Sequence, residues 1–440
     1  MKRRDFVAGA AALGLSACAP GSRSEETAGA PTKSASRPPN IFYICVDDLG
    51  TSLGCYGNDQ VVSPHIDAFA RDAVLFEEAH CQIAVCTASR TSILTGLRPE
   101  TTLVTKLNDD WRAALPGVAS LPQHLQAGGY NTISIGKIWD PRAGAGSNEG
   151  WTEKQDEWGV EFEIPDVIEA VDRASARDEP FALFLGFKEP HCPWEPPAEA
   201  LAAYEGRTVT PDGPGRTITS GYLQKCSGAN TRELSDDLAS DITRRYYGSV
   251  TKMDAQVGAL MAYLKRTGHY DDAVIVFWSG DHGYHLGQND HWGKWTTHVA
   301  SSRVPLLMRV PGVTQGGTRS PRLVETVDMY PTLLDLAGLP APDHALEGRS
   351  FARLLSEPEA GFKDHAFTFW RPDDQDPARA QSFSVKTERY NYIWHIWGSE
   401  ELFDHQEDPG EENDLHITSP DIVAELRTVL LEHYKHAIEN

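Results

Sequence analysis

Cys86 and Arg90 lie four residues apart in the stretch VCTASRTSILTG, residues 85–96. Side chains four positions apart meet on one face of a helix, so a helix beginning near Cys86 would bring the guanidinium beside the sulfur. The free N–H groups at such a helix start also favour a bound anion. These residue types suit a reactive cysteine beside an anion-binding arginine, but a cysteine that only packs in the core can have the same spacing.

Two polar pairs follow long apolar runs elsewhere in the chain. Asp47-Asp48 follows NIFYICV, and Asp281-His282 follows DAVIVFWSG. Adjacent aspartates face opposite ways within a strand, so both reach one ion only if the strand stops there, and Gly50 permits such a turn. One pair alone is equally consistent with a strand end in solvent, whereas two pairs favour a hard-cation site. Oxygen ligands indicate Ca²⁺ or Mg²⁺ rather than Zn²⁺, and His282 leaves other metals open.

Five apolar runs without polar alternation predict buried strands, and parallel strands covered on both faces have this pattern. The runs are residues 40–46, 130–136, 180–187, 272–280 and 304–310. Helical stretches lie between them at 120–129 and 249–268. This alternation predicts a doubly wound α/β sandwich, in which ligands bind outside the carboxyl ends of the strands. Lys137 and His191 follow the second and third runs, so we expect them at the same edge as the acidic residues.

The composition is that of an acidic globular protein. The chain has 440 residues, 40% of them hydrophobic and 23% charged, with a formal net charge of −23. This length allows one large domain with a smaller one. The negative charge argues against general nucleic-acid binding, which needs a basic surface, but a few buried lysines and arginines can still form a pocket for an anionic substrate.

The N-terminus has the features of an export signal. Arg3 and Arg4 precede a short apolar segment, as in a twin-arginine signal, and this segment is too short to span a bilayer permanently. Residues 15–18 resemble a bacterial lipobox, in which Cys18 is lipidated after cleavage; the alternative is a chance cysteine in a plain signal peptide. We expect residues 1–37 to be signal and tether. The protein would then be periplasmic or lipid-anchored at the cell envelope, with membrane contact only through the anchor.

The stretch from Cys86 resembles the signature of type I sulfatases. CTASRTSILTGLRP follows the pattern Cys-x-Pro/Ala-Ser-Arg with a Thr-Gly-x-x-Pro tail, and the resemblance extends over nearly the whole mature chain. The other matching segments are RVPLLMRVPG (303–312), VETVDMYPTLLDLAGLP (324–340) and the C-terminal ELFDHQEDPGEENDL (401–415). RPETT followed by DDWR, and PHCPWEPP, look closest to the iduronate-2-sulfatase-like branch.

The resemblance implies the alkaline-phosphatase-like fold of the α/β class. That fold has a mixed, mostly parallel central sheet sandwiched by helices, with a smaller C-terminal α+β subdomain. We place the catalytic domain at residues 38–355 and the C-terminal subdomain at 356–440. The subdomain is expected to be a short antiparallel sheet with a closing helix, because its last segment has apolar residues at helical spacing.

The resemblance also assigns the nucleophile and the metal ligands. Cys86 would be converted by a maturation enzyme to formylglycine, whose hydrate attacks sulfur and displaces the alcohol. The second hydroxyl of the hydrate would then help to eliminate sulfate. The residues that match the family's metal ligands are Asp47, Asp48, Asp281 and His282, with residue 86 completing the shell.

Four cationic or basic side chains complete the matched set. Arg90 would bind the oxygens of the nucleophile with its planar fork, and Lys137 matches a sulfate-contacting lysine. Lys294, in HWGKW, matches a second lysine that touches sulfate, and His191, in EPH, matches the histidine beside the leaving group. Either His191 or Lys294 would protonate the leaving oxygen. The implied substrate is a sulfated carbohydrate, such as a uronate 2-O-sulfate in a glycosaminoglycan or related polysaccharide.

The chain departs from the family pattern at three places. Ala88 replaces the commoner proline of the signature, and the maturation machinery of some bacteria is expected to accept alanine. Asp140 stands where a histidine that contacts formylglycine is expected. When ionised it donates no proton and repels sulfate, so either a loop histidine such as His285 or His291 substitutes or the activity is altered. Gln-Asn at 288–289 stands where Glu-His is usual, which leaves the identity of the substrate open.

Two other functions share parts of this pattern. A phosphatase or phosphonate monoester hydrolase of the same superfamily has this fold and metal placement, but such enzymes usually have other nucleophiles or more zinc-binding histidines. A surface lipoprotein that binds sulfated glycans without turning them over would be consistent with Asp140. An unmodified thiol at Cys86 in protein from the native host would favour this last interpretation.

Overall fold

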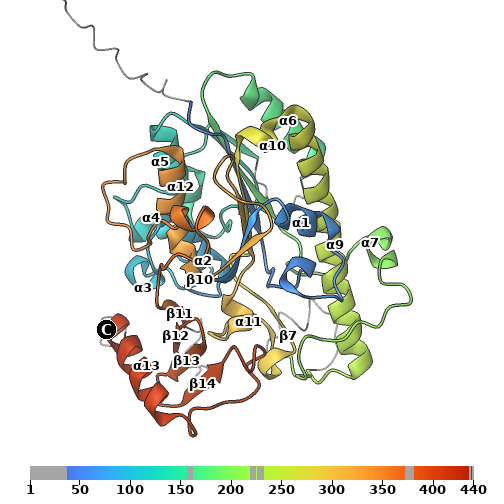
Figure 1. Ribbon diagram of the computed structural model, residues 1–440, viewed down its shortest axis with the longest axis vertical. Helices are drawn as coiled ribbons and strands as arrows, with labels where there is room; N and C mark the ends of the chain where they lie inside the picture. The colour runs from blue at the N-terminus through green and yellow to red at the C-terminus, as the bar shows by residue number, and fades with distance from the viewer. Residues whose placement is uncertain are drawn as a thin grey trace, which may run out of the picture. The chain divides into compact units, whose positions relative to one another are not determined.

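An eight-stranded sheet lies at the centre of the unit Pro38–Asn440 (Figure 1). Its strand order is β10-β2-β9-β6-β1-β5-β3-β4. Its strands are β1 (Ile41–Val46), β2 (Val74–His80), β3 (Asn131–Gly136), β4 (Glu153–Gln155), β5 (Phe181–Phe187), β6 (Val274–Ser279), β9 (Leu306–Arg309) and β10 (Thr318–Glu325). β1 runs parallel to its neighbours β5 and β6, and all of its residues are buried. The first apolar run therefore forms a central strand covered on both faces, as predicted.

The computed structural model describes residues 37–155, 162–218, 224, 232–371, 381–435 and 438. Contacts within the chain separate Met1–Arg37 from Pro38–Asn440, and the second unit holds the sheets. The expected signal peptide and the lipobox Cys18 lie outside the described residues. Among the helices that are described, none is long and apolar enough to cross a membrane.

β9 does not have the direction expected for the run 304–310. It is antiparallel to both β2 and β6, so the expectation of a parallel strand is wrong there and the sheet is mixed. A continuous apolar run shows that helices cover both faces of a strand, but it does not show which way the strand points. The apolar runs also miss three strands. β2 contains Glu77 and Glu78, β10 is irregular between Ser320 and Leu323, and β4 has only three residues.

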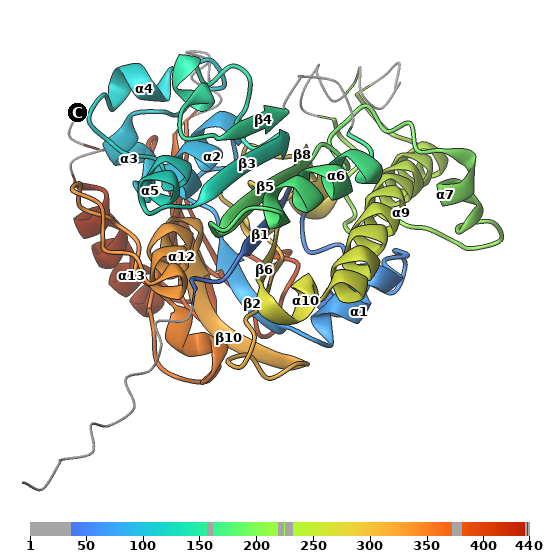
Figure 2. The same cartoon turned by 90° about the horizontal axis from the view of Figure 1, so that it is seen from above.

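Helices cover both faces of this sheet (Figure 2). Phe42 and Ile44 of β1 pack with α1, α6 and α9 on one face, whereas Ile41 and Tyr43 pack with α2, α5 and α12 on the other. The helices are α1 (Pro64–Ala70), α2 (Cys86–Thr95), α3 (Pro99–Thr102), α4 (Trp111–Ala114), α5 (Leu121–Ala127), α6 (Ile164–Ser175), α7 (Ala198–Ala202), α9 (Asp236–Thr267), α10 (His269–Asp272), α11 (Val299–Ser302) and α12 (Met329–Ala337). The helices predicted at 120–129 and 249–268 correspond to α5 and the second half of α9.

The C-terminal part forms a second sheet of four antiparallel strands in the order β11-β12-β13-β14. Its elements are β11 (Ala366–Trp370), β12 (Ser382–Lys386), β13 (Tyr390–His395), β14 (Glu400–Asp404) and the helix α13 (Pro420–His433). Leu426 and Leu430 of α13 belong to the same apolar cluster as Phe383 of β12. The expected short antiparallel sheet with its closing helix is therefore present.

This second sheet contacts the segment that leads into α2. The N–H of Phe369 donates to the carbonyl of Gln82 at 2.9 Å, and the hydroxyl of Thr368 donates to the carbonyl of Cys81 at 2.7 Å. Both contacts fall a few residues before Cys86 in the chain. β11 therefore fixes the backbone from which the helix of the signature segment begins.

Glu411, in the C-terminal motif, fixes a second segment. Its carboxylate accepts hydrogen bonds from the N–H of Val299 at 2.8 Å and from the amide of Asn391 at 2.7 Å, and it contacts Nε2 of His405 at 3.0 Å. Val299 begins α11, the helix that follows the loop of Lys294. The motif that resembles a sulfatase C-terminus thus ties the last sheet to that loop.

Glu411→Gln should destabilise the protein most near neutral pH. Burial alone would raise the pKa of Glu411, but hydrogen bonding to His405 and the nearby charge of His298 lower it from 4.5 to about 2. A carboxyl whose pKa is lower in the folded chain stabilises the fold above pH 4.5, and this stabilisation is lost as the pH falls towards 2. Urea unfolding at pH 7 should show a loss of about 3 kcal/mol for the variant, and the loss should shrink at pH 3.

Glu407→Gln, at an exposed position of the same segment, is the matched control. Its free energy of unfolding should stay within about 0.5 kcal/mol of the unchanged protein. A Glu411→Gln variant as stable as this control at pH 7 would show that the buried carboxylate is not what stabilises the junction.

Candidate active site

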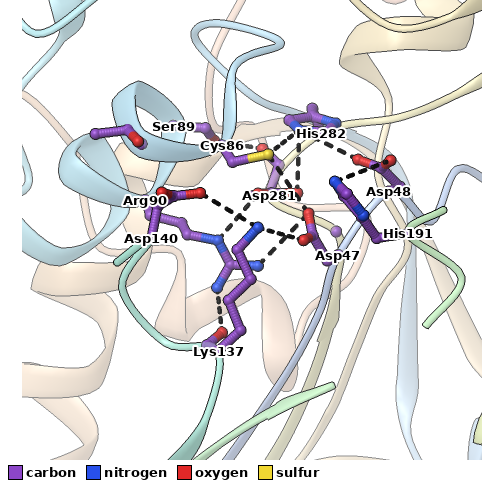
Figure 3. A network of polar contacts seen from close by, with 12 residues as sticks. Asp47, Asp48, Cys86, Ser89, Arg90, Lys137, Asp140, His191, Asp281 and His282 are labelled. Atoms are coloured by element: carbon purple, nitrogen blue, oxygen red, sulfur yellow. Dashed lines mark hydrogen bonds and ion pairs between the residues drawn. The ribbon is translucent and has the colours of Figure 1, made fainter. Parts of the chain in front are cut away.

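The carboxyl ends of four strands meet at one edge of the main sheet, and the site lies there (Figure 3). Val46, the last residue of β1, pairs with Phe187 of β5 and Ser279 of β6, so these three strands end level with one another. Gly136 at the end of β3 pairs with Gly186 of β5. The residues that follow these strands therefore come together, as the strand pattern predicted.

Five potential ligand groups lie at this edge, each buried, with their ligand atoms within 4.8 Å of one another. They are Asp47, Asp48, Cys86, Asp281 and His282. The turn that brings the two adjacent aspartates to one side is at Asp48, whose φ is +60°, and not at Gly50 as the sequence suggested. Aspartate adopts this left-handed conformation more readily than most residues do.

The chemistry of this group fits a hard divalent cation. Nδ1 of His282 lies 3.1 Å from the carbonyl of Gly283, so a proton on Nδ1 leaves the lone pair of Nε2 facing the site. Oδ1 of Asp281 is buried, and none of the described residues donates a hydrogen bond to it. Three carboxylates with one imidazole form an oxygen-rich set that suits Ca²⁺ or Mg²⁺.

Cys86 is the first residue of α2, which begins there and ends at Gly96 in a left-handed turn. Its Sγ lies 3.6 Å from Oδ1 of Asp47, 3.4 Å from Nε2 of His282 and 3.0 Å from Nζ of Lys294. Burial raises the pKa of the Cys86 thiol, and the charges of Asp281 and Asp47 raise it further. This favours the protonated form of an unmodified thiol. The sulfur faces the polar residues at the edge of the sheet, so Cys86 is not a cysteine that only packs in the core.

Arg90 lies one helical turn further on, and three of its neighbours fix the guanidinium. Nε donates to Oδ2 of Asp281 at 3.0 Å, and Nη1 donates to the carbonyl of Ile138 at 2.9 Å and to that of Lys137. Nη2 is buried 3.9 Å from Oδ1 of Asp47 and has no hydrogen-bond partner among the described residues. The arginine is therefore held rigidly while one of its nitrogens can donate to a ligand.

Two lysines and a histidine surround the carboxylates. Nζ of Lys137 donates to Oδ2 of Asp47, and Nζ of Lys294 donates to Oδ1 of Asp48 at 2.6 Å. Nε2 of His191 lies 3.9 Å from Oδ2 of Asp48, and its Nδ1 lies 2.7 Å from the carbonyl of Cys192. Burial alone would raise the pKa of Asp47, but Lys137 and His191 hold it well below its ordinary value. All the site residues predicted from the sequence are thus in one place.

Asp140 is also at the site, but its charge is not exposed to a ligand as the sequence suggested. Its carboxylate accepts two hydrogen bonds from the guanidinium of Arg142, each at 2.7 Å, and lies 3.3 Å from Nζ of Lys137. Burial would raise the pKa of Asp140, but these two cations lower it to about 2. The carboxylate is therefore ionised and already paired. Arg142 carries no strand or helix pattern, so the sequence alone does not single it out.

The two loop histidines contact residues of their own loop. The two ring nitrogens of His285 lie 3.0 Å from the carbonyl of Gln288 and 2.9 Å from the hydroxyl of Thr296, so this ring is engaged within its own loop. Nε2 of His291 lies 2.8 Å from the carbonyl of Lys294, where it supports the lysine. Asn289 donates to the carbonyl of Glu411 at 2.8 Å. These residues therefore position the loop of Lys294.

Two supporting contacts complete the site, one from Tyr246, which carries no signal in the sequence, and one from Ser89, the serine of the signature segment. The hydroxyl of Tyr246, in α9, donates to the carbonyl of Asp48 at 2.8 Å, and the hydroxyl of Ser89 donates to the carbonyl of Asp281. Both act on the backbone of a metal-site residue. A tyrosine in a long helix gives no indication of such a role, because the contact joins residues that are far apart in the chain.

Comparison with known proteins now identifies the family. Residues 39–339 match the sulfatase family. The chain belongs to the sulfatase family. Residues 287–436 of this sulfatase also match the C-terminal region of N-sulphoglucosamine sulphohydrolase.

The sequence of this sulfatase is similar to mammalian iduronate 2-sulfatases and to bacterial sulfatases. It is 30% identical to iduronate 2-sulfatase of Mus musculus over 389 residues, which cover 70% of each chain. It is 28% identical to a sulfatase of Formosa agariphila, over 85% of this chain and 82% of that one. The protein is thus a type I sulfatase, a sulfuric ester hydrolase with an iduronate 2-sulfatase-like relationship.

Solved structures share the fold of this sulfatase. One, of a protein in complex with its substrate D-glucosamine-2-N,6-O-disulfate, has a TM-score of 0.77 at 21% identity and covers 92% of this chain and 99% of its own. The phosphonate monoester hydrolase of Agrobacterium radiobacter has a TM-score of 0.73 at 23% identity and covers 90% and 95%. At these identities the structures establish the shared alkaline-phosphatase-like fold.

Removal of divalent metal should destabilise this sulfatase. An ion held by Asp47, Asp48 and Asp281 would bind only the folded chain and would offset the repulsion between their carboxylates. At a hundredfold excess over Kd, such binding adds about 2.7 kcal/mol to the free energy of unfolding. Protein treated with EDTA should regain this stability on addition of Ca²⁺ or Mg²⁺, as measured by urea unfolding.

Asp281→Asn should abolish most of this metal-dependent gain. Asp254→Asn is the matched control, because Asp254 is also buried but accepts hydrogen bonds from the N–H groups of His65 and Ile66 at the start of α1. The control should keep the full gain. Equal gains in both variants would place the ion elsewhere.

Proposed function

We propose that this sulfatase hydrolyses sulfate esters of sulfated sugars, with residue 86 as formylglycine and with a divalent cation, Ca²⁺ or Mg²⁺. The observation that carries the proposal is the convergence of Cys86 with four ligand residues within 4.8 Å. The ligands would be Asp47, Asp48, Asp281 and His282, with residue 86 completing the shell.

The balance of charge supports a sulfate monoester as the substrate. Three carboxylates at the site face three fixed cations, Arg90, Lys137 and Lys294, so the side chains nearly cancel. A divalent cation would make the site net positive and would stabilise negative charge on the oxygens of the reacting group. The site would then attract a monoanionic ester. In water the negative charge of such an ester repels nucleophiles, and the positive charge of the site would offset this repulsion.

The side chains around residue 86 have distinct tasks in this proposal. Arg90 orients the nucleophile through the nitrogen that points at Asp47, while Lys137 and Lys294 bind oxygens of the sulfate. Lys294 lies 3.0 Å from Sγ of Cys86, within reach of a group attached there. Either His191 or Lys294 gives a proton to the leaving alcohol oxygen, because both face Asp48 beside the nucleophile.

Conversion of Cys86 to formylglycine would resolve the poor reactivity of its thiol. The thiol is buried and held in its protonated form, which makes it a weak nucleophile. The hydrated aldehyde supplies a hydroxyl nucleophile and a second hydroxyl that helps to release sulfate. A formylglycine-generating maturation enzyme is therefore a proposed partner, and it would act on this segment before folding because Cys86 is buried in the folded chain.

The relatives support a carbohydrate as the alcohol. Some relatives are iduronate 2-sulfatases, and a structural neighbour binds D-glucosamine-2-N,6-O-disulfate. We propose a uronate 2-O-sulfate or a related sulfated oligosaccharide of the glycosaminoglycan type for this chain. Of the four tryptophans near the motifs, Trp111, Trp194 and Trp292 are buried and support the fold, whereas Trp295 is half-buried.

We propose export to the cell envelope, with lipidation at Cys18 as the anchor. Cys192 is disulfide-bonded. Disulfides persist in oxidising compartments such as the periplasm, which supports export. Fractionation of the native host, with and without Cys18→Ala, tests this: the unchanged protein should remain with membranes, and the variant should be released in soluble form.

A phosphonate monoester hydrolase is the second candidate, because such an enzyme shares the fold over 90% of this chain. Assays with an aryl phosphonate monoester and an aryl sulfate, run side by side, separate the two functions. A non-catalytic glycan-binding protein would turn over neither. Higher turnover of the phosphonate than of any sulfate would overturn the proposed reaction.

Cys86→Ala should lower turnover of a sulfated uronate or hexosamine by about a thousandfold or more, because the nucleophile is lost. The protein should be coexpressed with a maturation enzyme, and sulfate release should be assayed over a panel of such oligosaccharides. Cys81→Ala is the matched control, because Cys81 is also a buried free cysteine, directed at the carbonyl of Ser301. The control should keep near-normal turnover.

Mass measurement of the peptide that contains residue 86 tests the modification directly. In active protein the peptide should be lighter than the cysteine form by the exchange of sulfur for oxygen and the loss of two hydrogens. Full turnover by protein with an unmodified thiol would remove formylglycine from the proposal.

A further inference from the structure

Asp140 and Arg142 form a paired unit beside the sulfate-binding lysine. Asp140 takes the position where a histidine is expected, and its carboxylate accepts hydrogen bonds from Nε and Nη2 of Arg142, both at 2.7 Å. The backbone N–H of Arg142 also donates to this carboxylate at 3.1 Å. The guanidinium is thus held in a two-point, planar contact that fixes its orientation.

This pair extends a row of alternating charges from the interior to the surface. Asp47 pairs with Lys137, Lys137 lies 3.3 Å from Asp140, and Asp140 pairs with Arg142 (Figure 3 shows the first three). The side chains of Asp47 and Asp140 are fully buried, that of Lys137 is 6% exposed and that of Arg142 is 38% exposed. The guanidinium of Arg142 is therefore the outermost charge of the row, next to the site but open to solvent.

Stacking and hydrogen bonds hold the loop that carries the pair. Trp139 stacks on Trp111 with ring centroids 4.8 Å apart and an angle of 2° between the rings. The N–H of Ala143 donates to the carbonyl of Asp140 at 2.9 Å, which closes the turn around Arg142. Arg90 holds the same loop through the carbonyl of Ile138. A ligand that meets Arg142 thus meets a positive group already in place, which limits the entropy cost of binding.

We propose that Arg142 is a specificity-determining residue that binds a second oxyanion of the substrate, beyond the sulfate that is hydrolysed. The inference deepens the proposed function and rests on it. The second oxyanion is a carboxylate or another sulfate on the same or the neighbouring sugar, since both can accept hydrogen bonds from Nη1 and Nη2 along the edge of the guanidinium that Asp140 does not contact. Asp140 is a positioning residue, because it acts through Arg142 and Lys137.

The order of the charges explains why Arg142 serves a second group. The reacting sulfate would lie among Arg90, Lys137 and Lys294, the cations nearest Cys86. Arg142 pairs with Asp140, which lies beside Lys137, so in this row of contacts the guanidinium comes one carboxylate after Lys137. An oxyanion one step along the sugar from the reacting sulfate would reach Arg142 without displacing that ion pair.

Binding to the full-length Cys86→Ala protein with Ca²⁺ present tests the proposal without turnover. Calorimetry would compare two matched pairs of probes. The first is N-acetylglucosamine 6-sulfate against glucosamine-2-N,6-O-disulfate, and the second is a uronate 2-sulfate disaccharide against its carboxyl methyl ester. In each pair a neutral group replaces the second oxyanion, and the pair that responds shows whether that group is a sulfate or a carboxylate.

Arg142→Ala should weaken binding of the doubly charged member of at least one pair about tenfold more than that of its singly charged partner, as expected for one charge-assisted contact. Arg142→Lys should keep part of the preference, since it keeps the charge but loses the fork. Arg353→Ala is the control, because Arg353 makes a similar two-point contact with Glu357 on an exposed surface. It should change neither member of a pair.

Losses that are equal for both members of each pair, or no loss, would overturn the role of Arg142 while leaving the proposed function intact. Failure of the protein to bind any of the four sugars, or of the matured enzyme to release sulfate from them, would instead overturn the proposed substrate class and this inference with it. The two failures are therefore distinguishable.

Discussion

The burial of three aspartates at the end of β1 and β6 is the constraint on which the site depends. Carboxylates are costly to remove from water unless opposite charges and hydrogen bonds compensate them. Here Asp47 pairs with Lys137, Asp48 with Lys294 and Asp281 with Arg90. Each cation comes from a different segment of the chain, so the charge balance forces α2, the loop after β3 and the loop after β6 to meet at one place.

The remaining architecture keeps those segments in position. α2 is buried along its whole length, so Cys86 and Arg90 cannot shift without disturbing the core. The second sheet contacts the backbone just before Cys86 through Thr368 and Phe369, and Glu411 fixes the start of α11. The described part of the C-terminal region adds no side chain to the five candidate ligand groups, yet it supports both sides of the site, which gives the C-terminal motif a physical role.

Much of this could be predicted from the sequence, because the strongest signals were local. Uninterrupted apolar runs located β1, β3, β5 and β6, and the residues after them lie at the site as the topology of α/β sheets requires. The predicted parallel direction of β9 was wrong, because burial on both faces does not determine whether a strand runs parallel or antiparallel to its neighbours. Tyr246 and Arg142 were missed because their contacts are set by tertiary packing, and neither follows a strand or stands in a recognisable pattern.

Asp140 illustrates how a change that looks harmful in the sequence can be neutral in the fold. An isolated carboxylate in place of a histidine would repel a sulfate, and the sequence suggested an altered activity or a substitute histidine. Arg142, two residues later, satisfies that carboxylate at both oxygens, so the pair adds no net charge. Asp140 and Arg142 share one tight turn. A substitution in this pair can therefore change which ligand groups the site prefers, while the buried ion pairs of Asp47, Lys137 and Arg90 stay unchanged.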